Sequence, residues 1–139
     1  MNEKAHFQIG QKATLFRIFT RDDIDKFANL SGDFNPIHVN EEFSRSTRFG
    51  GVIVHGVLVV SMISTLLGTE LPGPGCIYKS QNLKFVSPVY PGDQLTATVE
   101  IIDWDSEKGR VRLLTEIKKQ EDALVVTGEA LLVMSSYIR

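Results

Sequence analysis

The sequence lacks the features that mark three common classes of protein. Its 139 residues include a single cysteine, Cys76, which excludes an intramolecular disulfide and fits a reducing compartment. There is no basic excess, because 15 lysines and arginines are outnumbered by 17 acidic residues, whereas nucleic-acid-binding domains are usually basic. The N-terminus has no apolar segment of the signal-peptide kind. We therefore expect a cytoplasmic protein with no nucleic-acid partner.

Motifs for metal binding and for covalent catalysis are missing too. The three histidines, His6, His38 and His55, do not fall at the spacings of known metal motifs. There is no Gly-x-Ser-x-Gly nucleophile motif. The glycine-rich turn around Gly73 and Gly75 lacks the GKS/T ending of a phosphate-binding loop. We expect neither a metal ion nor a cofactor.

The one long apolar run, residues 52–68, is shorter than the ~20 apolar residues of a membrane span. Polar or small residues also interrupt it, at His55, Gly56, Ser61 and Ser64. It far exceeds the usual strand of ~5–6 residues. Drawn as a helix it is apolar on almost every side, which is typical of a helix buried all round. The sequence therefore predicts one central helix over 52–68 and no membrane partner.

Two short helices are expected before the central one. Thr20 suits the N-cap of the first, and Gly32 suits the position past its end. Asn40 suits the N-cap of the second, over residues 41–46, and the segment 33–39 between them is expected to be non-regular. The buried stripe of the first helix is predicted to consist of Ile24, Phe27, Ala28 and Leu30.

The remaining chain has the two-residue alternation of strands. Residues up to Gln11 are mixed and polar and are expected to form an arm, and residues 13–19 a first strand. Helices segregated from an antiparallel sheet make an α+β fold, and 139 residues suit one domain, 1–139. An open sheet leaves a face or edge to cover, so we expect a dimer. Four later strands are predicted, over residues 77–86, 94–104, 111–118 and 123–134.

Asp33 and His38 are the sharpest candidates for chemistry. They lie five positions apart across a turn stiffened by Pro36, so their side chains can converge on one point. Together they can supply a carboxylate base and an imidazole acid near neutral pH and hold one water between them. The alternative is structural, because an aspartate in a turn often bonds its own backbone.

Three residues of the central helix offer further interactions. Gly56, near its start, exposes backbone N–H groups that suit a developing oxyanion, or else simply permits close packing. His55 is interpreted as structural, tying the helix entry to neighbouring backbone. Ser64 can hydrogen-bond Asp33 or a substrate, or instead the preceding carbonyl of its own helix.

Residues 31–38 (SGDFNPIH), followed by 49–56 (FGGVIVHG), resemble the hydratase-2 motif of the MaoC-like dehydratase family. The likeness is above all to the short, single-domain (R)-specific enoyl-CoA hydratases. It implies a hot-dog fold, in which a curved antiparallel sheet wraps one long helix, and homodimers with the substrate tunnel at the interface. Counterparts of the family also occur at 71–75, 81–85, 91–93 and 126–130.

The resemblance also implies roles for single residues. Asp33 and His38 correspond to the catalytic dyad that holds the water, and Asn35 to a residue that orders the loop and the site. Gly56 corresponds to the glycine whose amide binds the thioester oxygen, and Ser64 to a helix serine near the dyad. The implied reaction is reversible hydration of trans-2-enoyl-CoA to (R)-3-hydroxyacyl-CoA.

Three other functions stay open at this stage. The first is dehydration of 3-hydroxyacyl chains on acyl carrier protein, which is the same chemistry with a carrier protein in place of CoA. The second is thioester hydrolysis, which uses the same fold. The third is a non-catalytic acyl-thioester binding module, in which Asp33 and His38 would have no catalytic role. Acyl chain length is also open, although Leu66 and Leu67 are expected to line the pocket. Docking of an acidic carrier would need basic residues such as Arg45, Arg48, Lys79 and Lys84.

Overall fold

The computed structural model describes residues 6–138. Its strands are β1 (Lys12–Ile18), β2 (Cys76–Gln81), β3 (Lys84–Phe85), β4 (Gln94–Asp105), β5 (Arg110–Lys119) and β6 (Ala123–Met134). Its helices are α1 (Arg21–Ser31), α2 (Pro36–Val39), α3 (Glu41–Arg45) and α4 (Gly56–Thr69), with 3₁₀ turns η1 (Gln120–Asp122) and η2 (Ser135–Tyr137).

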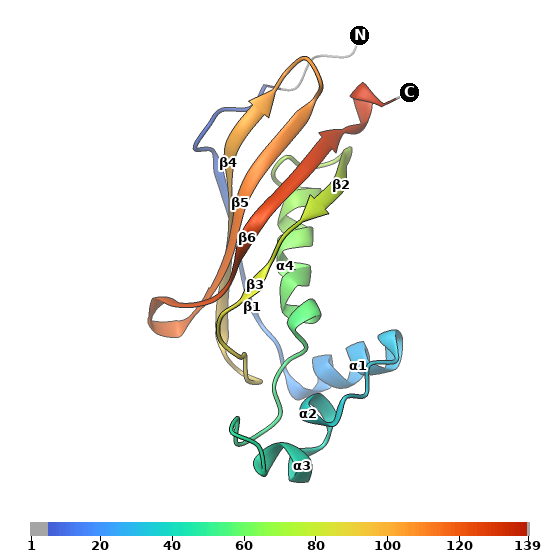
Figure 1. Ribbon diagram of the computed structural model, residues 1–139, viewed down its shortest axis with the longest axis vertical. Coiled ribbons are helices and arrows are strands. Elements are labelled where there is room, and N and C mark those ends of the chain that lie inside the picture. Colours follow the sequence, from blue (N-terminus) through green and yellow to red (C-terminus); the bar gives the residue numbers. More distant parts are fainter. Residues whose placement is uncertain (1–5, 139) are drawn as a thin grey trace.

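All six strands belong to one antiparallel sheet, in the order β1-β4-β5-β6-β2, with β3 also paired to β6. The sheet is curved, and α4 runs along one of its faces (Figure 1). The short helices α1, α2 and α3 gather at the end of the molecule where α4 begins, and the described part of the chain starts and finishes at the opposite end (Figure 1). This is the hot-dog arrangement that the family resemblance implied.

The alternation along β4 explains how sheet and helix share one core. Leu95, Ala97, Val99 and Ile101 are all fully buried, while the residues between them point away from α4 or are partly exposed. From α4 the core receives Val59, Met62, Ile63, Leu66 and Leu67. Burial of such apolar side chains is the main favourable term in folding, so the period of two in this strand positions the sheet against the helix.

Helix α1 begins and ends where its capping residues predicted. Thr20 accepts a hydrogen bond from the Asp23 amide and Asp23 bonds back to the Thr20 amide, which forms a capping box. Gly32 ends the helix in the left-handed conformation, with φ of 81°. The prediction that Leu30 is buried was wrong, because it is 89% exposed. It lies six positions after the buried Ile24, about 120° round the helix.

The central helix starts later than the apolar run predicted. Residues 52–55 are not helical, because the Val54 amide bonds the Val89 carbonyl (2.7 Å) and the Ile53 amide bonds the Ile37 carbonyl (3.2 Å) instead of helical partners. Helix α4 is also not buried all round, since Val57 is 71% exposed. An exposed stripe follows one side of the helix through Val57, Ser61, Ser64, Thr65 and Gly68.

Three smaller predictions also need correction. The strand expected over 77–86 is split into β2 and β3, with a register shift in the β2–β6 pairing between Tyr78 and Ser80, so five strands follow α4 rather than four. The segment 33–39 contains the helical turn α2. Of the expected N-terminal arm, residues 1–5 lie outside the described residues, but Phe7 packs edge-on against Trp104, with ring centroids 4.9 Å apart.

Among residues 6–138, no helix has both the length and the apolar character needed to cross a membrane.

Candidate active site

The turn before α2 is built by its own polar side chains. Asn35 caps α2 by accepting a hydrogen bond from the Ile37 amide (3.3 Å), and Pro36 occupies the first helical position. One carboxylate oxygen of Asp33 accepts a bond from the Asn35 amide (3.2 Å). One oxygen of Asp33 thus bonds the backbone of its own turn, as the structural explanation of this residue predicted. The carboxylate is exposed, and its second oxygen is left for another partner.

Helix α2 presents His38 to the segment that precedes α4. Its Nδ1 lies 2.8 Å from the Ile53 carbonyl oxygen. A carbonyl only accepts hydrogen bonds, so we assign the proton to Nδ1, which leaves Nε2 as an acceptor. Burial lowers the pKa of His38 below its ordinary value, and the nearby His55 ring lowers it further, against the opposing effects of Ile53 and Asp33. The neutral imidazole is therefore favoured.

The structure brings Asp33 and His38 together, as the five-residue spacing predicted. One oxygen or nitrogen atom from each of Asp33, His38 and His55 lies within 4.8 Å of the others. A separation of that size lets two groups share one water. The sequence did not indicate that His55 would join this pair.

His55 is the functional candidate that sequence reasoning underrated. It occupies the N-cap position of α4, yet its side chain makes no cap and is only 2% exposed. Its Nε2 lies 3.0 Å from the backbone oxygen of Asp33, which confirms the expected tie to neighbouring backbone. Its ring also stacks on His38, with centroids 4.1 Å apart and planes at 28°. The only signal in the sequence was a histidine inside an apolar run.

A cluster of one carboxylate and two imidazoles raises the question of a metal ion. Zinc ligands lie about 2.0–2.2 Å from the ion, with their lone pairs converging on it. Imidazole lone pairs lie in the ring plane, so the stacked rings of His38 and His55 direct them along roughly parallel planes. Each ring also has one nitrogen engaged by a backbone carbonyl. The arrangement suits hydrogen bonding better than tetrahedral metal coordination.

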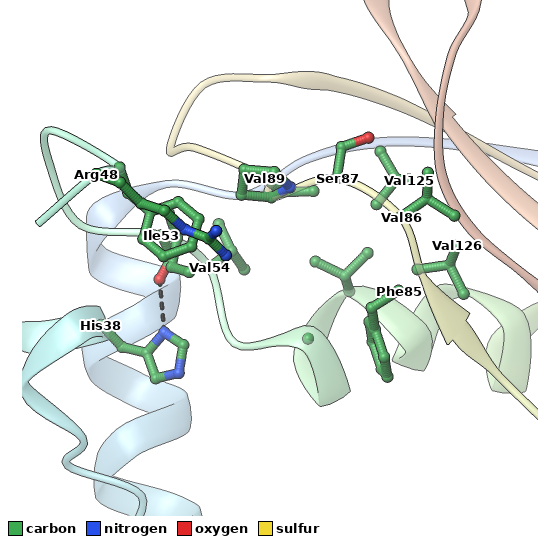
Figure 2. A pocket seen from close by; sticks show the side chains of 14 residues that line it. His38, Arg48, Ile53, Val54, Phe85, Val86, Ser87, Val89, Val125 and Val126 are labelled. Atoms are coloured by element: carbon green, nitrogen blue, oxygen red, sulfur yellow. Dashed lines mark hydrogen bonds between the residues drawn. The ribbon is translucent and has the colours of Figure 1, made fainter.

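A pocket of about 250 Å³ opens beside the His38 ring. Figure 2 shows His38 at one end of it and, beyond the start of α4, the apolar side chains of Phe85, Val86, Val125 and Val126. Arg48 lies over the Phe49 ring, 4.9 Å from its centroid, at the His38 side of the pocket. A polar reactive end and apolar walls suit an acyl chain whose reacting group faces His38.

Gly56 lines this pocket as the first residue of α4. A Cβ atom at this position would lie 2.7 Å from Phe85 Cε1, so the close-packing explanation of the glycine holds. Among the described residues, its N–H group has no acceptor, as expected for the first turn of a helix. Packing and an available donor therefore coexist at the same residue.

Three residues of α4 that were expected to line the pocket or to contact Asp33 or a substrate lie outside its lining. Leu66 and Leu67 are each 1% exposed and belong to the core rather than to the pocket lining, so that prediction was wrong. The walls come instead from the chain at β3 and the start of β6. Ser64 lies on the exposed stripe of α4, outside the lining of this pocket, and its contact with a substrate stays a prediction.

The chain is similar to known proteins over most of its length. Residues 3–124 match the family described as MaoC like domain. The (R)-specific enoyl-CoA hydratase of Aeromonas caviae is 46% identical over 123 residues, covering 88% of this chain and 92% of that protein. The (R)-specific enoyl-CoA hydratase of Rhodospirillum rubrum is 46% identical over 121 residues, covering 87% and 83%. The solved (R)-hydratase from A. caviae involved in PHA biosynthesis superimposes with a TM-score of 0.88 at 44% identity, covering 92% of this chain and 97% of that one.

Proposed function

This chain belongs to the MaoC-like family, and from that premise we propose that it is an (R)-specific enoyl-CoA hydratase. The reaction adds water to a trans-2-enoyl-CoA to give the (R)-3-hydroxyacyl-CoA and runs in reverse as a dehydration, which makes the enzyme a hydro-lyase. The observation that carries the proposal is the convergence of Asp33 and His38, with His38 facing an apolar pocket. No cofactor is required for this chemistry.

Asp33 and His38 activate the water in the proposed mechanism. The water donates its two hydrogen bonds to the Asp33 carboxylate and to Nε2 of His38, so a lone pair of its oxygen faces C3 of the substrate. As the C3–O bond forms, Nε2 takes one proton and the electrons of the C2–C3 double bond move toward the thioester oxygen. The His38 imidazolium, stabilised by Asp33, then returns a proton to C2. The imidazole acid of the sequence prediction thus first acts as a base.

The Gly56 amide stabilises the negative charge that moves onto the thioester oxygen. It opens α4, so the positive end of the helix dipole lies behind it. A donor of this kind typically contributes about 10²–10³ in rate. Asn35 acts indirectly, by holding the turn that carries Asp33.

We infer that the working unit is a homodimer of this single domain, residues 1–139, in the cytoplasm. In the single chain, the edge strand β2 leaves Ile77 and Tyr78 exposed, and α4 leaves Val57 exposed. Exposed apolar side chains at a sheet edge are normally covered by another chain or element. A second copy over the α4 stripe would also give Ser64 an environment in which to meet the acyl-CoA. The single thiol, Cys76, fits a reducing compartment.

The test is incubation of the purified protein with crotonyl-CoA, following the enoyl-thioester absorbance and free thiol together. We expect fast loss of absorbance without thiol release. Thiol release would indicate a thioesterase, and absence of any reaction with bound substrate a binding module. Initial rates on matched CoA and carrier-protein substrates decide the remaining alternative. A higher rate on the carrier-protein substrate would show that the acyl group is carried by acyl carrier protein rather than by CoA.

A further inference from the structure

His55 is a buried histidine that the proposed reaction does not use. Among the described residues, its Nδ1 is the one buried side-chain nitrogen or oxygen without a hydrogen-bond partner. A buried polar atom without a partner lowers stability, so its presence calls for a physical reason. Phe27 packs edge-on against the ring at 4.8 Å and His38 covers one face, so the ring is held on several sides.

Two histidines join the catalytic turn to the entry of α4 reciprocally. His38 donates from Nδ1 to the carbonyl of Ile53, and His55 lies with Nε2 3.0 Å from the carbonyl of Asp33. The Ile53 amide adds a third bond, to the Ile37 carbonyl. The segments 33–38 and 53–55 are therefore held together by hydrogen bonds near both ends of each segment.

His55 supplies the one long-range hydrogen bond of Asp33 among the described residues. The other bonds of Asp33 are local: its amide bonds the Ser31 hydroxyl, and its carboxylate accepts from the Asn35 amide. Local bonds shape a turn but do not place it relative to the rest of the protein. The bond from His55 joins residues 22 positions apart, and it comes from a side chain that is itself buried.

We propose that His55 is a positioning residue for the pair Asp33 and His38, an inference that rests on the proposed hydratase activity. Through Nε2–H it holds the main chain of Asp33, and through its ring face it fixes the plane of the His38 imidazole. The side chains of Asp33 and His38 are thereby kept at a separation that one water can bridge. The carbonyl of Asp33 can only accept, so this role requires the Nε2–H tautomer of His55. His55 itself does not touch the reacting atoms.

Two substitutions separate the hydrogen bond from the packing. His55→Gln places an amide donor near the position of Nε2, whereas His55→Leu keeps a similar volume without a donor. We expect His55→Leu to lower kcat by about 10- to 100-fold while KM changes less than about threefold, because small misplacement of catalytic groups costs rate rather than binding. His55→Gln should retain kcat within about fivefold of the wild type.

Thr115→Val is the matched control, because Thr115 is also fully buried and polar and bonds a carbonyl, that of Gly128. It lies on β5, outside the pocket lining, so its loss should lower thermal stability and leave kcat unchanged. Wild-type kcat in folded His55→Leu would overturn the proposal, as would an equal loss in the Gln and Leu variants. Either result would make His55 a packing residue only.

Imidazole ¹⁵N NMR of the wild-type protein tests the same claim without any activity. We expect His55 to show the Nε2–H tautomer, and His38 the Nδ1–H tautomer with Nε2 as acceptor. An Nδ1–H tautomer at His55 would overturn the proposal even if both variants failed to fold. If the protein does not hydrate crotonyl-CoA, the proposed function fails, while the tautomers still decide whether His55 holds Asp33.

Discussion

The two ends of α4 differ in what surrounds them. Toward its C-terminus, Met62, Ile63, Leu66 and Leu67 are buried in the apolar core shared with the sheet, and this burial favours folding. At its N-terminus lie a buried histidine, one nitrogen of which has no partner among residues 6–138, and a glycine that the Phe85 ring closely approaches. One element thus joins a core optimised for packing to a site that retains unsatisfied polar groups. Stability and activity should therefore respond to different substitutions.

The largest expected effect is loss of activity at the dyad without loss of fold. Asp33→Asn and His38→Ala should each lower kcat on crotonyl-CoA by about 10²–10⁴, the usual contribution of general acid–base groups. Asp33 is exposed and His38 only partly buried, so thermal unfolding should change little. Steady-state rates and melting curves on the same samples check both halves. Near wild-type turnover in either variant would remove that residue from the mechanism.

The opposite pattern is expected at the other end of the helix. Ile63 is fully buried in the core, and Ile63→Ala should lower the free energy of unfolding by about 2–5 kcal/mol through lost contacts and the cavity left behind. The pocket lining does not include Ile63, so kcat per folded molecule should stay within about twofold of the wild type. Denaturant unfolding and initial rates give the two values. A kcat loss as large as that of His38→Ala would contradict the separation.

Gly56 lies where the two regions meet. Gly56→Ala adds a Cβ that would lie 2.7 Å from Phe85 Cε1, so the ring must move from its place in the pocket. We expect kcat/KM to fall by about 10- to 100-fold, because the amide and the pocket wall shift together. The double variant Gly56→Ala/Phe85→Leu should recover part of the loss, measured as a double-mutant cycle. Additive losses would show that the two residues act independently.

A smaller effect is expected from pH. Burial lowers the pKa of His38, and the mechanism needs the neutral imidazole, so kcat/KM should fall on the acid side with a midpoint below about 6.5. The unfolded chain binds the proton more readily than the folded one in this range. The contribution of His38 to stability is therefore lost as pH falls from about 6.5 through its lowered pKa. A midpoint above the ordinary histidine value would contradict a partly buried, neutral base.

Patterns among neighbouring residues predicted most helices and strands. Contacts between residues distant in sequence decided where some of them begin and which side chains are buried. The Thr20 and Asn40 caps, the Gly32 stop and the alternation of 94–104 were readable because each depends on neighbouring residues. The start of α4 could not be predicted in this way, since the bond from the Val54 amide to the Val89 carbonyl holds the preceding residues out of the helix. Nor could the exposure of Leu30, because its apolar character alone does not tell which side of the helix is covered.

The same division holds within the site. Asp33 and His38 were predicted to converge because a short, proline-stiffened turn limits where their side chains can lie. The contact of His55 with both of them depends on the path of the chain between 38 and 55, which no local pattern encodes. The approach of Phe85 to Gly56 likewise joins residues from different elements.

The most direct test of the central claim is the configuration of the product that the wild-type protein makes from crotonyl-CoA. A single water held by Asp33 and His38 beside the Gly56 amide is predicted to give (R)-3-hydroxybutyryl-CoA, at a rate about 10²–10⁴ lower in Asp33→Asn. The (S) product, or an unchanged rate in that variant, would contradict the account.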